Sequence, residues 1–227
     1  MSIFETVSLP CPSCGTEVEF EAVNSVNADR RPDLREAIME GTFQQKPCGN
    51  CESKFRLQPK LIYQDVARSQ WFLVYPADEM QRWQQCEDEA QSTFDRTFGA
   101  DAPESAKAIG EGLHIRVVFG WAGLREKLAA ADAQLEDREL ELTKIATLGG
   151  LGSVPMSAES ELRYSHADAE NLVLAWVDSV SDSLIEAIGV PREIYDDVVA
   201  SADWKPLREA LSQGSFVDLR RMVFGLA

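Results

Sequence analysis

Two Cys-x-x-Cys pairs constrain this chain more than any other feature, one at residues 11–14 and one at residues 48–51. In such a pair a tight turn directs both sulfurs to one side, so two pairs can enclose a single ion. Zinc binds thiolates at about 2.3 Å in a tetrahedron, and four protein ligands leave no open position for a reacting water. We therefore expect one structural Zn²⁺. Its predicted ligands are Cys11, Cys14, Cys48 and Cys51.

Redox chemistry and an iron–sulfur cluster are the alternative uses of these cysteines. A redox motif usually has one pair, between a strand and a helix, whereas this chain has two pairs in strand–turn contexts. A disulfide framework needs an oxidising compartment. Residues 1–10 lack the basic segment and long apolar run of a secretory signal, so we expect a cytoplasmic protein. The interval from Cys14 to Cys48 is longer than in short zinc ribbons and has room for a strand and a helix.

Acidic residues dominate the charge, and they are unevenly distributed. The formal net charge is −16. Residues 1–75 carry 8 Lys and Arg against 10 Asp and Glu, whereas the remainder carries 14 against 28. Because phosphate binding needs a basic surface, this balance disfavours a general nucleic-acid-binding protein. No apolar run approaches the length of a membrane span, so we expect no membrane partner.

Residues 1–76 predict a zinc ribbon with a helix inserted between its two cysteine pairs. Alternating apolar residues predict strands at 6–9 and 17–22, on either side of the first pair. Pro32 suits the first turn of a helix, and Gly41 suits its end. Further strands are expected at 41–46, before the second pair, and then around Phe55 and at 61–63 and 70–75.

Several basic residues near the predicted ribbon are candidate contacts for a protein partner or for nucleic acid. Three surround the start of the inserted helix, and two follow the second cysteine pair, where Lys46 and Lys60 add further positive charge. Since charge runs are usually solvated faces, we favour that interpretation over a binding role. The candidate contacts are Arg30, Arg31, Arg35, Lys54 and Arg56.

Residues 77–152 predict helices with one strand. An apolar stripe that includes Trp83 and Phe98 predicts a helix over 78–99, followed by a polar linker or frayed helix over 99–112. A β-branched, aromatic run predicts a strand over 114–119. Helices are expected over 122–131 and 135–148. We interpret four of their charged residues as ordinary surface charges: Glu126, Lys127, Glu141 and Lys144.

The glycine-rich segment 149–155 predicts a flexible linker and a domain boundary. After it, the apolar period changes to two. Strands are predicted at 161–164, 172–177 and 184–190, with His166 in the first turn, and together they form a β-meander. Pro191 opens a helix. We expect Asp203 to cap a helix over 204–211, and Ser215 with Asp218 to cap the last helix.

These elements predict an α+β fold in three parts. Residues 1–76 form a zinc-ribbon-like β module with an inserted helix. Residues 77–152 form a mostly helical region with one strand. Residues 153–227 form a β-meander with helices.

The cysteine pairs and their surroundings resemble the CpXC family of bacterial proteins. The resemblance lies in Cys-Pro-x-Cys-Gly at 11–15, the second pair, the Tyr63-x-Asp65 motif and an apolar strand that ends at Tyr75-Pro76. It is specific over residues 8–76. Looser likenesses lie at 118–120, 124–127 and 190–195. The second pair has Gly49 where the family's double form has proline, which leaves the ligands unchanged. The resemblance implies a cysteine-bound metal and a bacterial cytoplasmic setting, and it implies no substrate.

Three functions of different class follow from these observations. The first is a non-enzymatic zinc-binding adaptor that binds a protein partner or copies of itself. The second is a nucleic-acid-binding or regulatory zinc ribbon. The third is an enzyme, for which His114, His166 and the lone Cys86 are weak candidates. The chain contains no nucleophile elbow, no His-Glu-x-x-His motif and no Walker lysine. We therefore name no catalytic residue and expect the adaptor.

Overall fold

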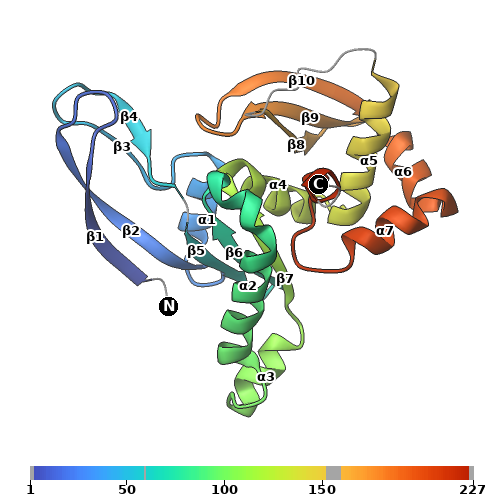
Figure 1. Ribbon diagram of the computed structural model, residues 1–227, viewed down its shortest axis with the longest axis horizontal. Coiled ribbons are helices and arrows are strands. Elements are labelled where there is room, and N and C mark those ends of the chain that lie inside the picture. The colour runs from blue at the N-terminus through green and yellow to red at the C-terminus, as the bar shows by residue number, and fades with distance from the viewer. Residues whose placement is uncertain (1–2, 59, 152–159, 225–227) are drawn as a thin grey trace. The chain divides into compact units, whose positions relative to one another are not determined.

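The chain folds as two compact units. The structure is a computed structural model that describes residues 3–58, 60–151 and 160–224. Residues 1–76 and 89–116 belong to the first unit, and residues 77–88 and 117–227 belong to the second (Figure 1). Both units mix helices and strands, which confirms the predicted α+β class. The three-part division at residues 76 and 152 stays a prediction.

The first unit is built on a five-stranded sheet of order β1-β2-β5-β6-β7. β1 (Ile3–Pro10) and β2 (Glu17–Asn27) form an antiparallel hairpin, and the first cysteine pair lies in its turn. β2 then pairs in parallel with β5 (Leu61–Asp65), which pairs antiparallel with β6 (Gln70–Tyr75). β7 (His114–Phe119) is the outer strand. The helix α1 (Pro32–Met39) lies between β2 and β5 in the chain, as the inserted-helix prediction required.

A second, shorter hairpin carries the other cysteine pair. β3 (Gln45–Pro47) pairs antiparallel with β4 (Lys54–Arg56). The predicted strand over 41–46 was too long at its start, since pairing begins at Gln45. A small apolar cluster joins this hairpin to β2, in which Phe20 meets Phe55 edge-on at 5.1 Å between ring centroids. The buried members of that cluster are Cys11, Val18, Phe20, Cys48 and Leu57.

Two further helices of the first unit pack against each other, and one of them also contacts the sheet. Phe94, in the second half of α2 (Trp83–Phe98), packs edge-on against Trp71 of β6 at 5.3 Å. The segment over 99–112, predicted as a polar linker or a frayed helix, contains a short helix, α3 (Glu104–Gly110). A Cβ at Gly110 would lie 2.5 Å from Cβ of Phe98, so α3 approaches α2 more closely than any larger residue allows.

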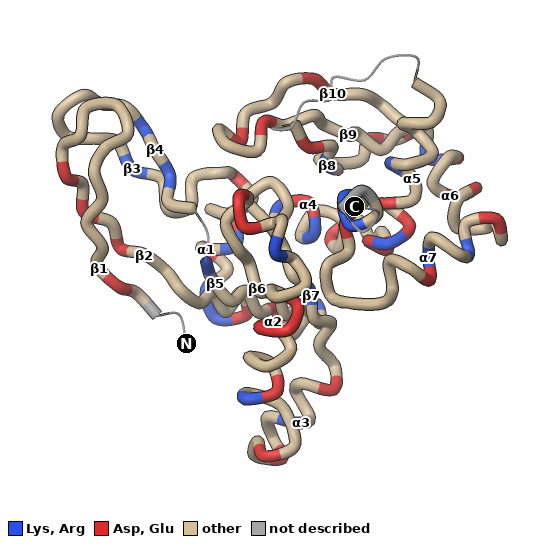
Figure 2. The backbone as a smooth tube through the Cα atoms, viewed as in Figure 1, with Lys and Arg blue, Asp and Glu red and all other residues tan. Residues whose placement is uncertain are grey.

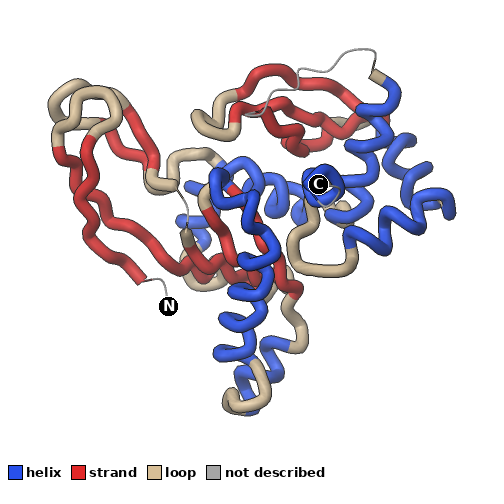
Figure 3. Tube along the Cα trace, in the orientation of Figure 1, coloured by secondary structure: helices blue, strands red, loops and turns tan. Residues whose placement is uncertain are grey.

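The second unit contains the predicted meander. Its sheet has the order β10-β9-β8, formed by β8 (Ser160–Ala167), β9 (Asn171–Asp178) and β10 (Leu184–Pro191), all antiparallel. Besides the first turns of α2, the second unit contains further helices, drawn in blue in Figure 3. They are η1 (Ala77–Arg82), α4 (Gly120–Asp132), α5 (Asp137–Gly150), α6 (Arg192–Ala200), α7 (Lys205–Leu211) and α8 (Arg220–Phe224), with the 3₁₀ turn η2 (Ala202–Trp204) before α7.

Three local predictions in this unit were wrong in detail. His166 lies in strand β8 rather than in the following turn, because pairing with β9 extends to Ala167. Asp203 does not cap the helix predicted over 204–211, because α7 has Trp204 at its N-cap and no side-chain cap bond; Ser201 caps the preceding η2, where its hydroxyl accepts from the Asp203 N–H. The glycine-rich segment begins as the last turn of α5, and residues 152–155 of the predicted linker lie outside the described residues.

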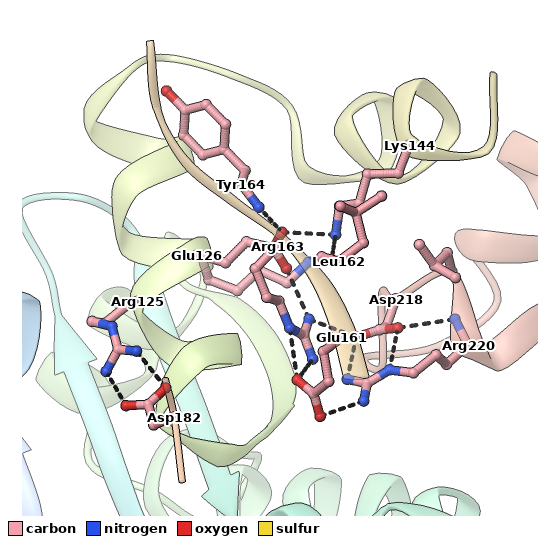
Figure 4. Close-up of polar contacts among 12 residues, drawn as sticks. Arg125, Glu126, Lys144, Glu161, Leu162, Arg163, Tyr164, Asp182, Asp218 and Arg220 are labelled. Carbon is pink, nitrogen blue, oxygen red and sulfur yellow. Dashed lines mark hydrogen bonds and ion pairs between the residues drawn. The ribbon is translucent and has the colours of Figure 1, made fainter. Parts of the chain in front are cut away.

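The charges predicted to be at the surface of α4 and α5 are buried. Glu126 and Lys144 are 1% and 0% exposed, and Lys127 and Glu141 are buried with them. Lys144 Nζ lies 2.7 Å from Glu126 Oε1 and 2.9 Å from Glu141 Oε1, and it also donates to the Leu162 carbonyl (Figure 4). The prediction failed because neighbouring β8 and the C-terminal segment cover these two helices, which no local pattern shows.

Arg163 of β8 extends the buried charges into a closed ring (Figure 4). Its guanidinium contacts Asp218 at 2.8 Å and Glu161 at 2.7 Å, and Arg220 contacts the same two carboxylates at 2.9 and 2.5 Å. Although burial opposes ionisation, the two arginines hold the pKa of Asp218 well below its usual range. Alternating charges therefore compensate one another where little water reaches them.

Backbone groups complete this network and fasten the C-terminal segment. The Tyr164 N–H donates to Glu126 at 2.6 Å, and the Leu219 N–H donates to Glu141 at 2.9 Å. Lys127 donates to the Val217 carbonyl at 2.6 Å. Since Phe216 and Val217 are also buried, the segment before α8 is held by apolar and charged contacts together.

Replacement of Lys144 by methionine tests this network. It removes the cation from between two buried carboxylates, and breaking a buried ion pair in this way typically costs about 3–5 kcal/mol of stability. We expect Lys144→Met to lower the urea midpoint strongly. Lys205→Met is the matched control, because Lys205 is 73% exposed in its pair with Glu209 and surface pairs contribute little. Equal midpoints for the two variants would contradict a structural role for the network.

Candidate metal centre

The first cysteine pair lies in a turn between β1 and β2, here called knuckle 1 (residues 11–16). The Cys11 N–H donates to the Thr16 carbonyl at 2.9 Å, and the Gly15 N–H donates back to the Cys11 carbonyl at 2.8 Å. Gly15 adopts a left-handed conformation with φ of 73°, which glycine enters without steric cost. Gly15 therefore relieves strain in the tight turn.

The second pair repeats the same hydrogen bonds between β3 and β4, in knuckle 2 (residues 48–53). The Cys48 N–H donates to the Ser53 carbonyl, and the Glu52 N–H donates to the Cys48 carbonyl, both at 2.9 Å. The left-handed residue here is Glu52, with φ of 59°. Glu52, and not Gly49, occupies the position equivalent to Gly15. In knuckle 2 a residue other than glycine therefore adopts the strained left-handed conformation.

The two knuckles bring all four sulfurs to one point. Every pair of Sγ atoms lies within 4.8 Å. Cys11 and Cys51 are 3.7 Å apart, as are Cys14 and Cys48. A tetrahedron with metal–sulfur bonds of about 2.3 Å has edges of about 3.8 Å, whereas a disulfide needs about 2.05 Å. These separations fit four thiolates around one metal ion. Within the part of the chain that the structure describes, this is the one group identified as able to hold a metal.

Each knuckle contributes one buried and one exposed cysteine. Cys11 and Cys48 are 2% and 1% exposed, whereas Cys14 and Cys51 reach the surface. Asn50 donates its side-chain amide toward Cys14 at 3.6 Å and its backbone N–H toward Cys48 at 3.5 Å. Ser13 also bonds to Ser53 at 2.9 Å across the two knuckles. Donors to sulfur stabilise the thiolate form that a metal requires.

The electrostatics of the cluster call for a cation. Hydrogen bonds with Thr16, then Asn50, lower the pKa of the Cys14 thiol to about 5. The Ser53 backbone amide favours ionisation of Cys51 too, but the neighbouring cysteines, Cys14 first, raise the pKa of Cys51 to about 12. Four like charges cannot share so small a volume unaided, and a divalent ion at the centre removes that conflict.

The predicted basic contacts are dispersed, and several are engaged within the chain. Arg31 forms a bidentate pair with Asp33, and Arg35 lies 3.9 Å from the buried Asp65, while Arg30 is exposed. Figure 2 shows Lys and Arg along β3 and β4. Of these, Arg56 donates to the Phe43 carbonyl at 2.8 Å, and Lys54 is exposed.

The residues considered for catalysis lie on three different elements. His114 lies exposed at the start of β7 in the first unit, and His166 lies exposed in β8 of the second. Cys86 is 0% exposed within α2, as expected for a cysteine that serves as a small apolar residue.

Sequence reasoning did not identify Asn50, Ser13 or Ser53 as parts of the centre. Asn50 could have been predicted from the sequence, because the backbone N–H of a residue between two ligating cysteines is directed at sulfur. The Ser13–Ser53 bond depends on how the knuckles meet, which no spacing predicts.

Fold and site together define an α+β protein with a four-cysteine cluster that could hold a metal ion. The chain belongs to the CpXC protein family, whose model matches residues 9–144. This span contains both knuckles and ends within α5. The searches of curated proteins and of solved structures found no match. Among the described residues, no helix is long and apolar enough to cross a membrane.

The equivalence of Gly15 and Glu52 makes a paired prediction. Gly15→Ala places a Cβ on a left-handed residue and should destabilise the chain by about 1–2 kcal/mol. Glu52→Gly removes the same strain, and we expect a smaller gain because glycine is more flexible when unfolded. Thermal unfolding of both variants with metal bound measures the two shifts. Shifts of the same sign would contradict the equivalence.

Proposed function

We propose that this protein is a non-enzymatic, zinc-stabilised interaction protein, or adaptor, of the cytoplasm. The observation that carries the proposal is the closed set of four sulfurs with separations of 3.7 Å between the knuckles. All four corners of a tetrahedron are protein ligands, so no position remains for substrate. Four thiolates and borderline-soft Zn²⁺ also match in chemical preference.

The proposed role of the metal is to hold the β1–β2 hairpin and the β3–β4 hairpin together. Besides the apolar cluster around Phe20, hydrogen bonds connect β2 to the 42–57 segment. Lys46 donates to the Glu19 carbonyl at 2.7 Å, and the Val23 N–H donates to Gln44 at 2.8 Å. The strands β3 and β4 span three residues each. Such a short hairpin is marginal alone, and metal binding supplies folding free energy.

A protein partner or a second copy suits this chain better than nucleic acid does. The net charge of −16 repels phosphate, and several basic side chains near the ribbon form bonds within the chain. Lys46 and Arg56 bond to backbone carbonyls, and Arg31 bonds to Asp33. These contacts lower the amount of positive charge available to a polyanion.

Nucleic-acid binding remains the second candidate because of one observation. Lys54 and Lys60 are exposed near knuckle 2. Lysines beside zinc knuckles are the positions from which such modules contact phosphates. The two candidates differ in how binding responds to salt.

Metal analysis tests the zinc assignment. We expect one zinc ion per chain after purification under reducing conditions. Cys51→Ser should lose the ion and the order of the first unit, because binding and folding are coupled there. Cys86→Ser is the matched control and should keep its zinc, since Cys86 lies outside the cluster. Chains without metal, or a Cys51→Ser chain with unchanged zinc and melting temperature, would refute the assignment.

Salt dependence separates the adaptor from the nucleic-acid reader. We expect the full chain to show no measurable affinity for single- or double-stranded polynucleotide at about 0.05 M salt, where phosphate contacts are strongest. Fluorescence anisotropy with labelled oligonucleotides measures this. Tight binding that weakens steeply with added salt, and that Lys54→Glu abolishes, would favour the second candidate.

A further inference from the structure

The metal centre combines exposed sulfur with close sulfur–sulfur approach. Cys14 and Cys51 are open to solvent, whereas Cys11 and Cys48 are almost fully buried. Each exposed sulfur lies 3.7 Å from the buried sulfur of the other knuckle: Cys51 from Cys11, and Cys14 from Cys48. A solvent-borne oxidant therefore reaches one member of each pair, and the other member is already beside it.

We propose that this centre is also an oxidant-responsive switch. Hydrogen peroxide converts its four thiolates into two disulfides, Cys11–Cys51 and Cys14–Cys48, and the zinc ion is released. This inference rests on the proposed function, because it requires zinc to occupy the cluster in the reduced chain.

The chemistry balances with peroxide as the sole oxidant. The Cys51 thiolate attacks one peroxide oxygen, so that an S–O bond forms, the O–O bond breaks and the hydroxide that leaves takes up a proton. Cys11 sulfur then attacks Cys51 sulfur. An S–S bond forms, the S–O bond breaks and the second hydroxide also becomes water. Two thiolates lose two electrons to one peroxide. The same steps at Cys14 and Cys48 consume a second peroxide, and the metal then has no thiolate ligand.

The pairing across knuckles has a structural consequence. Closing a disulfide from 3.7 Å requires the sulfurs of each pair to move together by about 1.7 Å. The resulting bonds connect the β1–β2 hairpin to the β3–β4 hairpin, as the metal did. Disulfides within a knuckle would leave the hairpins unlinked. The oxidised centre therefore keeps the two hairpins together, and reduction returns four thiolates to the same place.

Cys86 provides an internal control. It is 0% exposed and lies outside the cluster, so the folded chain should keep it as a thiol while the centre oxidises. Its state shows whether peroxide acts on the native chain or on unfolded material.

The experiment uses the full chain, purified with zinc and freed of reductant. Hydrogen peroxide is added stepwise, and released zinc is followed with a chromogenic chelator. We expect release of one zinc ion per chain with about two peroxides consumed. Mass spectrometry of proteolytic fragments should then show the Cys11–Cys51 and Cys14–Cys48 disulfides and a Cys86 thiol. Dithiothreitol followed by zinc should restore the original metal content. Cys86→Ser is the matched control, and its release curve should equal that of the parent chain.

Three outcomes would overturn this inference while the proposed function stands. They are retention of zinc when peroxide is in large excess, disulfides confined to Cys11–Cys14 and Cys48–Cys51, and conversion of the sulfurs to sulfinic or sulfonic acids that dithiothreitol does not reverse. A reduced chain that contains no zinc before peroxide is added would refute the proposed function, and this inference with it.

Discussion

Four sulfur atoms from two hairpins meet at one point, and the arrangement of the front of the chain depends on that meeting. The β1–β2 hairpin belongs to a larger sheet, but β3 and β4 pair only with each other. Without a central cation, the thiols cannot all ionise, as the opposite pKa shifts of Cys14 and Cys51 show. A metal at the centre would therefore make the close approach of the knuckles favourable. That approach buries Cys11 and Cys48.

In the second unit, buried side chains of opposite charge compensate one another. Five acidic and four basic side chains gather between α4, α5, β8 and the segment before α8, and their contacts alternate in sign. Burial raises the pKa of Glu141, while Lys144 and Arg163, against the effect of burial, lower the pKa of Glu126. The members are Glu126, Lys127, Asp137, Glu141, Lys144, Glu161, Arg163, Asp218 and Arg220.

Sequence patterns predicted what depends on near neighbours in the chain. The structure contains the strand at 114–119 and the β-meander, and it brings the spaced cysteines together, as the patterns predicted. These features were predictable because cysteine spacing, apolar periodicity and turn residues are local properties of the sequence. Glu141 and Lys144 show the limit. Their spacing of three is typical of a solvated helix face, and only the packing of β8 and the C-terminal segment makes them buried. Likewise, the Tyr63-x-Asp65 motif carried no stated role until the structure placed Asp65 against Arg68 and Arg35.

The family match ends at a residue that belongs to this charge network. The match ends at residue 144, within α5, yet Lys144 and Glu126 are held by groups that follow it in the chain. Arg163 is 2.9 Å from Glu126, and the Leu162 carbonyl accepts from Lys144. A buried Glu126 that lost Arg163 would keep an uncompensated share of negative charge. Residue 144 is therefore no boundary of folding. Any sequence that replaces the part beyond it must bring a cation to the same position over α4, or Glu126 and Lys144 must change with it.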